Sequence, residues 1–266
     1  MTTHPVLDLQ LRQLKLPGIA AHYAQVAHDA GAAQLSYPAY LQALTTAELD
    51  QRAQVRQRRC LQHAQFPVVK ELADFDWTAL PSLNPMQVRD LAAGHYLRQA
   101  ENVLLVGNPG LGKTHLATAL GVAACRQGER VRFWNTAGLV TDLLAAQQAH
   151  TLTRVLRQIL TYRLIILDEL GFVPLSPTGA QLLFQFCAAL HERVALIITT
   201  NLRFADWTQV FGNESLTAAL LDRVTARAHI IACVGDSYRV RQRQQRQLTR
   251  HPAHDFGGDR PQAPDG

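Results

Sequence analysis

Gly107-Asn108-Pro109-Gly110-Leu111-Gly112-Lys113-Thr114 has the G-x-x-x-x-G-K-[ST] spacing of a phosphate-binding loop. The apolar run at residues 103–106 precedes it as a buried strand would, and a helical pattern of apolar residues follows it. In such a loop the backbone N–H groups surround phosphates at a helix N-terminus, and the lysine reaches the terminal phosphates. These residues are therefore candidates for binding ATP, and the hydroxyl of Thr114 is also a candidate ligand for Mg²⁺.

The 266-residue chain is long enough for one α/β domain and a smaller unit. Its 47% hydrophobic and 18% charged residues are typical of a packed globular protein. No run is long enough to cross a membrane and the N-terminus lacks a secretory pattern, so we expect a cytoplasmic protein without membrane association. The four scattered cysteines form no C-x-x-C pair, which favours buried free thiols over a zinc site.

The formal net charge is +5, and arginine carries nearly all of the positive charge because the only lysines are Lys15, Lys70 and Lys113. A basic balance favours a polyanionic partner such as nucleic acid, and arginine makes bidentate contacts to phosphate. An arginine bias of a GC-rich genome explains the arginine-to-lysine ratio equally well.

Residues 1–64 show helical spacing and predict a small all-helical N-terminal domain that contacts DNA or a partner. Pro17 interrupts the first pattern, which indicates a helical hairpin or a bent helix, and Ser36 is placed to begin the next helix.

Three arginines of that next helix, Arg52, Arg56 and Arg59, follow i, i+4, i+7 spacing and would project from one face. They are candidates for contacts to a DNA backbone. A solvated helix face partly neutralised by Glu48 is an equally supported interpretation. Arg154 and Arg157, on a predicted helix at residues 152–160, are further candidates for DNA contacts.

Residues 65–249 predict an ordered connector followed by alternating strands and helices. The apolar strands are expected at 103–106, 131–133, 164–167, 196–199 and 229–232, and Thr136 is expected to cap the helix after the second. Continuous apolar strands separated by helices indicate a parallel sheet covered on both faces. Residues 250–266, rich in Pro, Gly, Asp and His, are expected to form a disordered tail.

Polar side chains follow two of these strands. Asp168 and Glu169 end the third strand as in a Walker B motif, so Asp168 would hold Mg²⁺ and Glu169 would orient the water that attacks a γ-phosphate. Asn201 follows the fourth strand and would reach the same water, although asparagine is also ordinary turn chemistry. Arg223 is a candidate arginine finger, with a surface pairing to Asp222 or Asp206 as the alternative.

These motifs together resemble the IstB-type ATP-binding proteins of IS21 transposons, which belong to the AAA+ ATPases and are similar to the helicase loader DnaC. The resemblance covers about residues 6–245 and includes Phe66-Pro67-Val68-Val69-Lys70, the stretch 167–175 and Gly235-Asp236-Ser237-Tyr238-Arg239. It implies a P-loop AAA+ (ASCE) fold without a separate lid domain. It also implies a sensor 1 at Asn201, an arginine finger at Arg223 and a sensor 2 candidate at Arg239.

The same resemblance implies an ATPase that uses ATP and Mg²⁺, assembles as a homo-oligomer on duplex DNA and delivers this target to an IstA-type transposase. Two alternatives share the same core: a DnaC-like loader of the replicative helicase, and a nucleotide-switched DNA-binding scaffold that barely hydrolyses ATP. The N-terminal region lacks the zinc-ligand set that one subgroup of loaders carries, which favours the transposon branch.

Overall fold

The computed structural model describes residues 4–235 and residue 238, so the predicted disordered tail at residues 250–266 lies outside the described residues. Its centre is a five-stranded sheet in the order β2-β3-β4-β1-β5, and every paired strand is parallel to its neighbour. The strands are β1 (Asn102–Gly107), β2 (Val131–Asn135), β3 (Leu164–Leu170), β4 (Ala195–Thr200) and β5 (Ala228–Cys233). The predicted α/β class and parallel sheet are confirmed.

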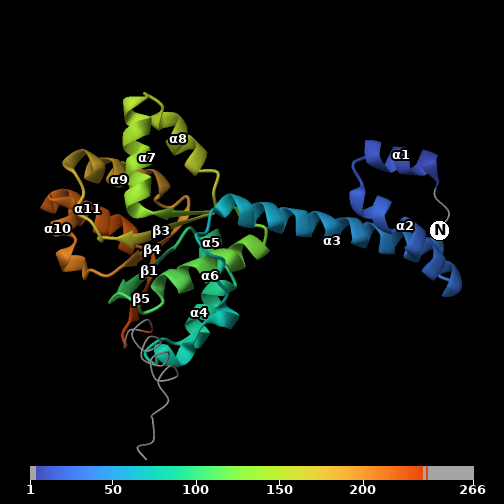
Figure 1. Ribbon diagram of the computed structural model, residues 1–266, viewed down its shortest axis with the longest axis horizontal. Coiled ribbons are helices and arrows are strands. Elements are labelled where there is room, and N and C mark those ends of the chain that lie inside the picture. Colours follow the sequence, from blue (N-terminus) through green and yellow to red (C-terminus); the bar gives the residue numbers. More distant parts are fainter. Residues whose placement is uncertain (1–3, 236–237, 239–266) are drawn as a thin grey trace, which may run out of the picture.

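Helices cover both faces of the sheet (Figure 1). One face carries α4 (Pro85–Ala92), α5 (His95–Arg98) and α6 (Lys113–Arg126), together with the connector and its short 3₁₀ helices η1 (Leu72–Asp74) and η2 (Trp77–Ala79). The other face carries α7 (Thr136–Gln148), α8 (Leu152–Ile159), α9 (Pro177–Leu190), η3 (Phe204–Asp206), α10 (Thr208–Phe211) and α11 (Glu214–Thr225). The predicted absence of a separate lid domain stays a prediction, because after β5 the structure describes only residues 234, 235 and 238.

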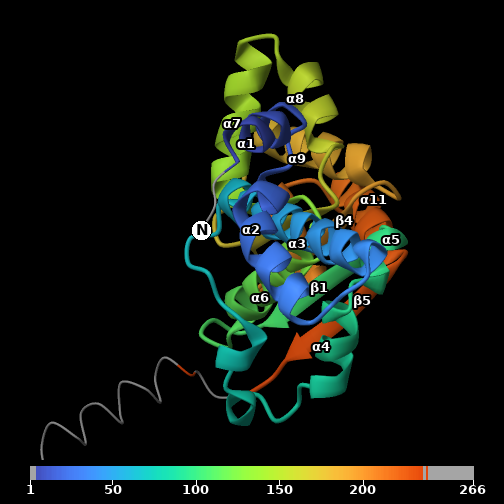
Figure 2. The same cartoon turned by 90° about the vertical axis from the view of Figure 1, so that its right-hand side faces the viewer.

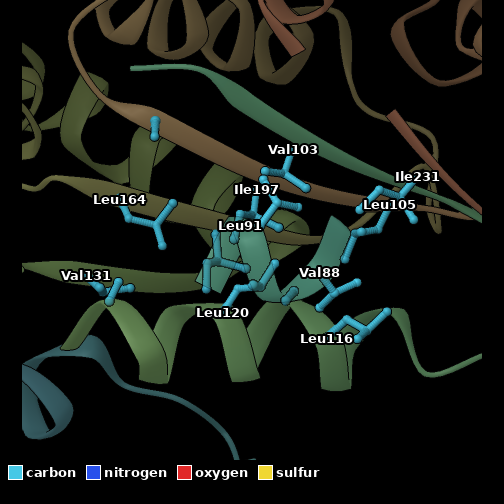
Figure 3. Packing of buried hydrophobic residues seen from close by; sticks show 14 of the residues in the cluster. Val88, Leu91, Val103, Leu105, Leu116, Leu120, Val131, Leu164, Ile197 and Ile231 are labelled. Atoms are coloured by element: carbon cyan, nitrogen blue, oxygen red, sulfur yellow. The ribbon is translucent and has the colours of Figure 1, made fainter. Parts of the chain in front are cut away.

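Strand residues alternate between the two layers because successive side chains point to opposite faces. In β1, Val103 and Leu105 pack in the α6 layer, whereas Leu104 packs in the α7–α11 layer, and all three are 0% exposed. Figure 3 shows Leu116 and Leu120 of α6 beneath these strands. Burial on both faces explains why the strands read as continuous apolar runs.

The N-terminal helices are α1 (Pro5–Gln13), α2 (Pro17–Ala32) and α3 (Tyr37–Ala64). Pro17 begins a new helix, which gives the helical hairpin, and Ser36 caps α3. A small core of Leu11, Tyr23 and Leu44 joins the three helices. Figure 1 shows α1 and α2 at the outer end of α3, away from the sheet, and Figure 2 views the molecule from the side of these helices.

The inner end of α3 packs directly on β2 and α6. Cys60 and Ala64 belong to the core of that face of the sheet, and the side chain of Gln57 donates to the carbonyl of Arg126 at 2.7 Å. One uninterrupted helix of 28 residues therefore connects the helical unit to the sheet. The domain division at residue 64 stays a prediction.

The helix after β2 is capped by Asn135, so the prediction of a Thr136 cap is wrong. Asn135 has an extended backbone, and its Oδ1 accepts from the amide of Ala137 at 3.1 Å. Thr136 is already helical, and its hydroxyl instead donates to the carbonyl oxygen of Asp168 at 2.8 Å.

Among the described residues no helix is both long and apolar enough to span a membrane.

A buried carboxylate joins α2 to α3. The side chain of Glu48 is only 7% exposed and accepts from the amides of Gly18 at 2.7 Å and Ile19 at 3.1 Å, and from Arg52 Nε at 2.6 Å. Burial on its own would raise the pKa of Glu48, but the hydrogen bonds from Arg52 and the two amides outweigh it, so the pKa is lowered. Its charged form therefore stabilises the folded helical unit.

We predict that Glu48→Gln loosens this unit by about 1–3 kcal/mol, because a neutral amide cannot satisfy three donors. Because the folded pKa is lowered, the stabilisation is present above the usual value of 4.5 and is lost as the pH falls through the lowered pKa. Native-state hydrogen exchange of the α2 amides, compared with those of α6, measures the effect. Asp50→Asn, an exposed change on the same helix, is the control, and equal exchange in both variants would contradict the prediction.

Candidate functional site

The loop at residues 107–114 joins β1 to α6, and two of its glycines are required by their surroundings. A Cβ on Gly107 would lie 2.1 Å from the carbonyl oxygen of Cys233, because β5 passes directly beside it. Gly112 has φ +78°, and a Cβ there would lie 3.0 Å from the Phe75 ring. A side chain at residue 107 would push the loop away from β5, and one at residue 112 would strain the backbone and crowd the Phe75 ring.

Lys113 begins α6 and folds its side chain back over the loop. Its Nζ donates to the carbonyl oxygens of Gly107 at 2.6 Å and Asn108 at 2.8 Å. The ammonium group is thus held against the same loop whose backbone would surround phosphates.

The carboxylate of Asp168 lies at the end of β3 and is held by two hydroxyl groups. Thr114 Oγ1 donates to its two oxygens at 2.9 and 3.1 Å, and Thr199 Oγ1, from β4, donates to Oδ1 at 2.6 Å. Asp168 is 6% exposed, and burial raises its pKa although the bonds from Thr199 and Thr114 and the nearby charge of Lys113 oppose the shift.

A buried carboxylate beside a hydroxyl group fits a magnesium ion. Hard divalent cations take oxygen ligands, and Asp168 with Thr114 supplies such a pair at the helix N-terminus. A cation would also offset the cost of burying the carboxylate charge, which two hydroxyl groups compensate only in part. The two predicted magnesium ligands are therefore adjacent in space.

Glu169 has an unusual backbone. Its φ is +59°, and the pairing of β3 with β4 is irregular between Leu167 and Leu170. The amide of Glu169 donates to Thr199 Oγ1 at 2.8 Å, and its carboxylate accepts from Asn135 Nδ2 at 2.9 Å. These contacts turn the side chain out of the strand, so that it is exposed at the cleft beside the loop.

That cleft has a volume of about 390 Å³. Of the predicted site residues it is lined by Pro109, Gly110, Gly112, Lys113, Thr114, Glu169 and Asn201. Leu111 is instead buried in the core at 4% exposure. The structure thus brings the loop, the strand-end acid and the strand-end amide together at the carboxyl edge of the sheet, where parallel sheets bind ligands.

Several residues of the site are missing from the sequence prediction. The cleft is also lined by Pro67, Val68, Lys70, His115, Thr118, Phe172, Thr199, Thr200 and Tyr238. The amide of Tyr238 donates to the carbonyl oxygen of Gly110 at 3.1 Å, which ties the chain after β5 to the loop. Asn135 is missing too, although its place between a strand and a helix is a recognisable cap signal.

Arg223 does not line this cleft. Its Nη1 donates to the carbonyl oxygen of Ala219 at 2.8 Å, and its guanidinium lies over the Phe184 ring at 4.9 Å. Neither alternative partner holds it, since Asp206 pairs with Arg203 at 3.0 Å and Asp222 forms no ion pair among the described residues. Arg239 lies outside the described residues.

The candidate DNA contacts differ in their surroundings. Arg52 is engaged with Glu48, whereas Arg56 and Arg59 are exposed on α3. Arg154 and Arg157 are exposed on α8, on the opposite layer of the sheet from α6. All five remain predictions as DNA ligands.

A family model and curated relatives of one kind match most of the length of the chain. The model of the family described as IstB-like ATP binding protein matches residues 9–246. An insertion sequence IS21 putative ATP-binding protein of Pseudomonas aeruginosa is 36% identical over 238 residues, which cover 90% of each chain. An insertion sequence IS232 putative ATP-binding protein of Bacillus thuringiensis subsp. berliner is 35% identical over 235 residues, 88% of this chain and 94% of that one.

Solved structures with this fold include AMPPCP-bound DnaA from Aquifex aeolicus, with a TM-score of 0.55 and 16% identity over 70% of this chain and 57% of that chain. DnaI matches with a TM-score of 0.51 and 17% identity over 63% of this chain and 89% of that chain. At these identities the likeness is one of fold alone.

We predict that Asp168→Asn stabilises the nucleotide-free protein at neutral pH. A carboxylate with a raised pKa loses folding stability as the pH rises through that pKa, and the neutral amide avoids this loss. The melting temperature should rise by roughly 2–6 °C. The additional stabilisation that Mg²⁺ gives in the presence of ADP should disappear.

Thermal unfolding with and without ADP and Mg²⁺ measures both effects. Asp142→Asn, an exposed change on α7, is the control and should alter neither. A lower melting temperature together with an unchanged magnesium effect would show that Asp168 is a structural residue.

Proposed function

Because the chain belongs to the family of IstB-like ATP-binding proteins of insertion sequences, we propose that it is an AAA+ ATPase that helps DNA transposition. It assembles on duplex target DNA with ATP bound and delivers this DNA to an IstA-type transposase. Hydrolysis of ATP controls assembly or release. The observation that carries the proposal is the cleft in which the phosphate-binding loop, the Thr114–Asp168 pair and Glu169 meet.

ATP binding follows from the loop geometry. The backbone of residues 107–112 and the ammonium group of Lys113, which is held at the loop by two carbonyl oxygens, contact the phosphates. Thr114 and Asp168 would hold Mg²⁺, which would supply positive charge against the phosphates.

Hydrolysis requires a water aligned with the terminal phosphate. Glu169 accepts a hydrogen bond from this water and polarises it for attack on the γ-phosphorus. The bond between the γ-phosphorus and the oxygen that bridges it to ADP breaks, and phosphate leaves. Asn135 fixes the orientation of the Glu169 carboxylate, and Asn201 contacts the water or the γ-phosphate from β4.

The place of Arg223 supports active sites shared between subunits. Arg223 does not line the cleft of its own chain, so in this proposal it acts on the nucleotide of a neighbouring copy, for which it exchanges its contacts with Ala219 and Phe184. Such an arrangement makes hydrolysis depend on assembly of a homo-oligomer. Arg239 remains a sensor 2 candidate.

We predict that Lys113→Ala weakens ATP binding by roughly ten- to a hundredfold, because a charge-assisted contact to phosphate is lost. Glu169→Gln should bind ATP normally but hydrolyse it roughly 10²–10⁴-fold more slowly, and should accumulate on duplex DNA. Titration with a fluorescent ATP analogue and gel shifts on duplex DNA separate the two effects. Equal DNA assembly by the wild type and both variants, with or without ATP, would disprove coupling between the nucleotide and DNA.

A second prediction concerns Arg223→Ala. Duplex DNA should stimulate steady-state ATP hydrolysis by the wild type, and this stimulation should fall by roughly 10³-fold in the variant if the arginine acts in trans. Arg193→Ala, at an exposed position, is the matched control. Mixing Arg223→Ala with Lys113→Ala should restore hydrolysis above either variant alone, because one supplies an intact cleft and the other an intact arginine.

The same assay separates the alternatives. Stimulation by single-stranded DNA alone would favour a loader of the replicative helicase. Absence of hydrolysis with every DNA, and also with the transposase added, would favour a nucleotide-switched scaffold. If the mixture of Arg223→Ala and Lys113→Ala hydrolyses ATP no faster than either variant alone, Arg223 does not act on the nucleotide of a neighbouring subunit.

A further inference from the structure

A basic groove of about 750 Å³ lies where α3 meets the β2 edge of the sheet. Its cationic side chains come from separate parts of the chain: Lys15 between α1 and α2, Arg52, Arg56 and Arg59 on α3, and Arg130 just before β2. No Asp or Glu is among the described residues that line it. The side chains that line the groove thus carry a net positive charge, and the groove is distinct from the nucleotide cleft.

The arginines of the groove are not equivalent. Arg52 is used within the fold, because its Nε pairs with Glu48 at 2.6 Å and its Nη2 donates to the carbonyl oxygen of Lys15 at 2.9 Å. Arg56, Arg59 and Arg130 form no ion pair among residues 4–235 and 238. No carboxylate therefore lies within ion-pairing distance of these three guanidinium groups, and they can attract an external anion.

The positions of two of these arginines are restricted by packing. The guanidinium of Arg130 lies over the Tyr162 ring at 5.2 Å from its centroid. A Cβ on Gly128 would lie 2.8 Å from Cδ of Arg56, so the aliphatic part of Arg56 passes closely over the Gly128 backbone. Restricted side chains lose less conformational entropy on binding.

The inner end of α3, which carries Arg59, is itself fixed. Gln57 donates to the carbonyl oxygen of Arg126 at 2.7 Å, and Arg132 donates to that of His63 at 3.3 Å. These two bonds therefore hold the inner end of α3 against the edge of the sheet, beside the groove.

We infer that this groove binds one strand of the phosphodiester backbone of duplex DNA through Arg56, Arg59 and Arg130, while Arg52 is a structural residue. The inference rests on the proposed function, which requires binding to DNA. Guanidinium groups bind phosphate in bidentate fashion, and contacts to phosphate carry no sequence information. The apolar wall around Tyr162 and Val131 suits the sugar edge of such a strand.

Spacing in the sequence groups Arg52 with Arg56 and Arg59, and it gives no reason to include Arg130. The structure changes the grouping in both respects. It shows that Glu48 already neutralises Arg52 and that Arg130 reaches the groove from the other wall. The site exists only where α3 is packed against β2, so neither element provides it alone.

The experiment measures binding of a fluorescent duplex by anisotropy, with ATP present, between 50 and 200 mM salt. The triple variant Arg56→Gln/Arg59→Gln/Arg130→Gln should bind at least about tenfold more weakly, and the slope of log affinity against log salt should become shallower by about 3. Arg52→Gln should leave this slope unchanged and lower the melting temperature instead.

The matched control is Arg89→Gln/Arg98→Gln/Arg193→Gln, which removes the same charge from exposed positions outside the groove. It should keep a wild-type slope to within about 1. Binding of ATP and the unfolding transition of each variant show whether the fold is intact.

The outcomes separate this inference from the proposed function. If the wild type binds duplex DNA and the groove variant binds with the same affinity and slope, the groove is not the DNA site, and the proposed function is unaffected. If the control weakens binding as much as the groove variant does, only net charge matters and the inference is wrong. If the wild type does not bind duplex DNA with or without ATP, both fail.

Discussion

The buried carboxylate of Asp168 is the point on which the two layers of the protein converge. Its side chain accepts from Thr114 at the start of α6 and from Thr199 on β4, while its backbone carbonyl accepts from Thr136 at the start of α7. One residue thus fixes the phosphate-binding loop, two strands and a helix from each face of the sheet. The hydroxyl oxygen of Thr199 also accepts a hydrogen bond from the amide of Glu169. The orientation of Glu169 therefore depends on the same group of hydrogen bonds.

This convergence depends on the order of the strands. With β4 between β3 and β1, the strand that carries Thr199 and leads to Asn201 lies between the Asp168 strand and the phosphate-binding loop. Parallel strands place all their carboxyl ends at one edge, so loops far apart in sequence meet there. The cleft is therefore a product of topology, and few of its side chains are neighbours in the chain.

The same distinction explains what the sequence could and could not predict. The loop at residues 107–114 and the two acids near the end of β3 were recognisable because their chemistry depends on local spacing. The strands were recognisable because they are apolar on both faces. The contact between Asn135 and Glu169 was not, because nothing local says that β2 lies beside β3. Likewise, the spacing of Arg52, Arg56 and Arg59 indicated a shared helix face, but it did not indicate that Arg52 pairs with a buried Glu48. That burial arises from the packing of α2 on α3, which the sequence does not reveal.

The single uninterrupted helix α3 gives the molecule a mechanical property. Its 28 residues make a rod of about 42 Å, held near its inner end and bearing α1 and α2 near the other (Figure 1). A tilt of about 10° at the inner end would carry the outer end about 7 Å, so a small displacement beside the sheet is amplified several-fold. The basic groove lies near the pivot of this lever. Whatever enters the groove therefore acts where the angle of the arm is set, and the distant helical unit would register the largest movement.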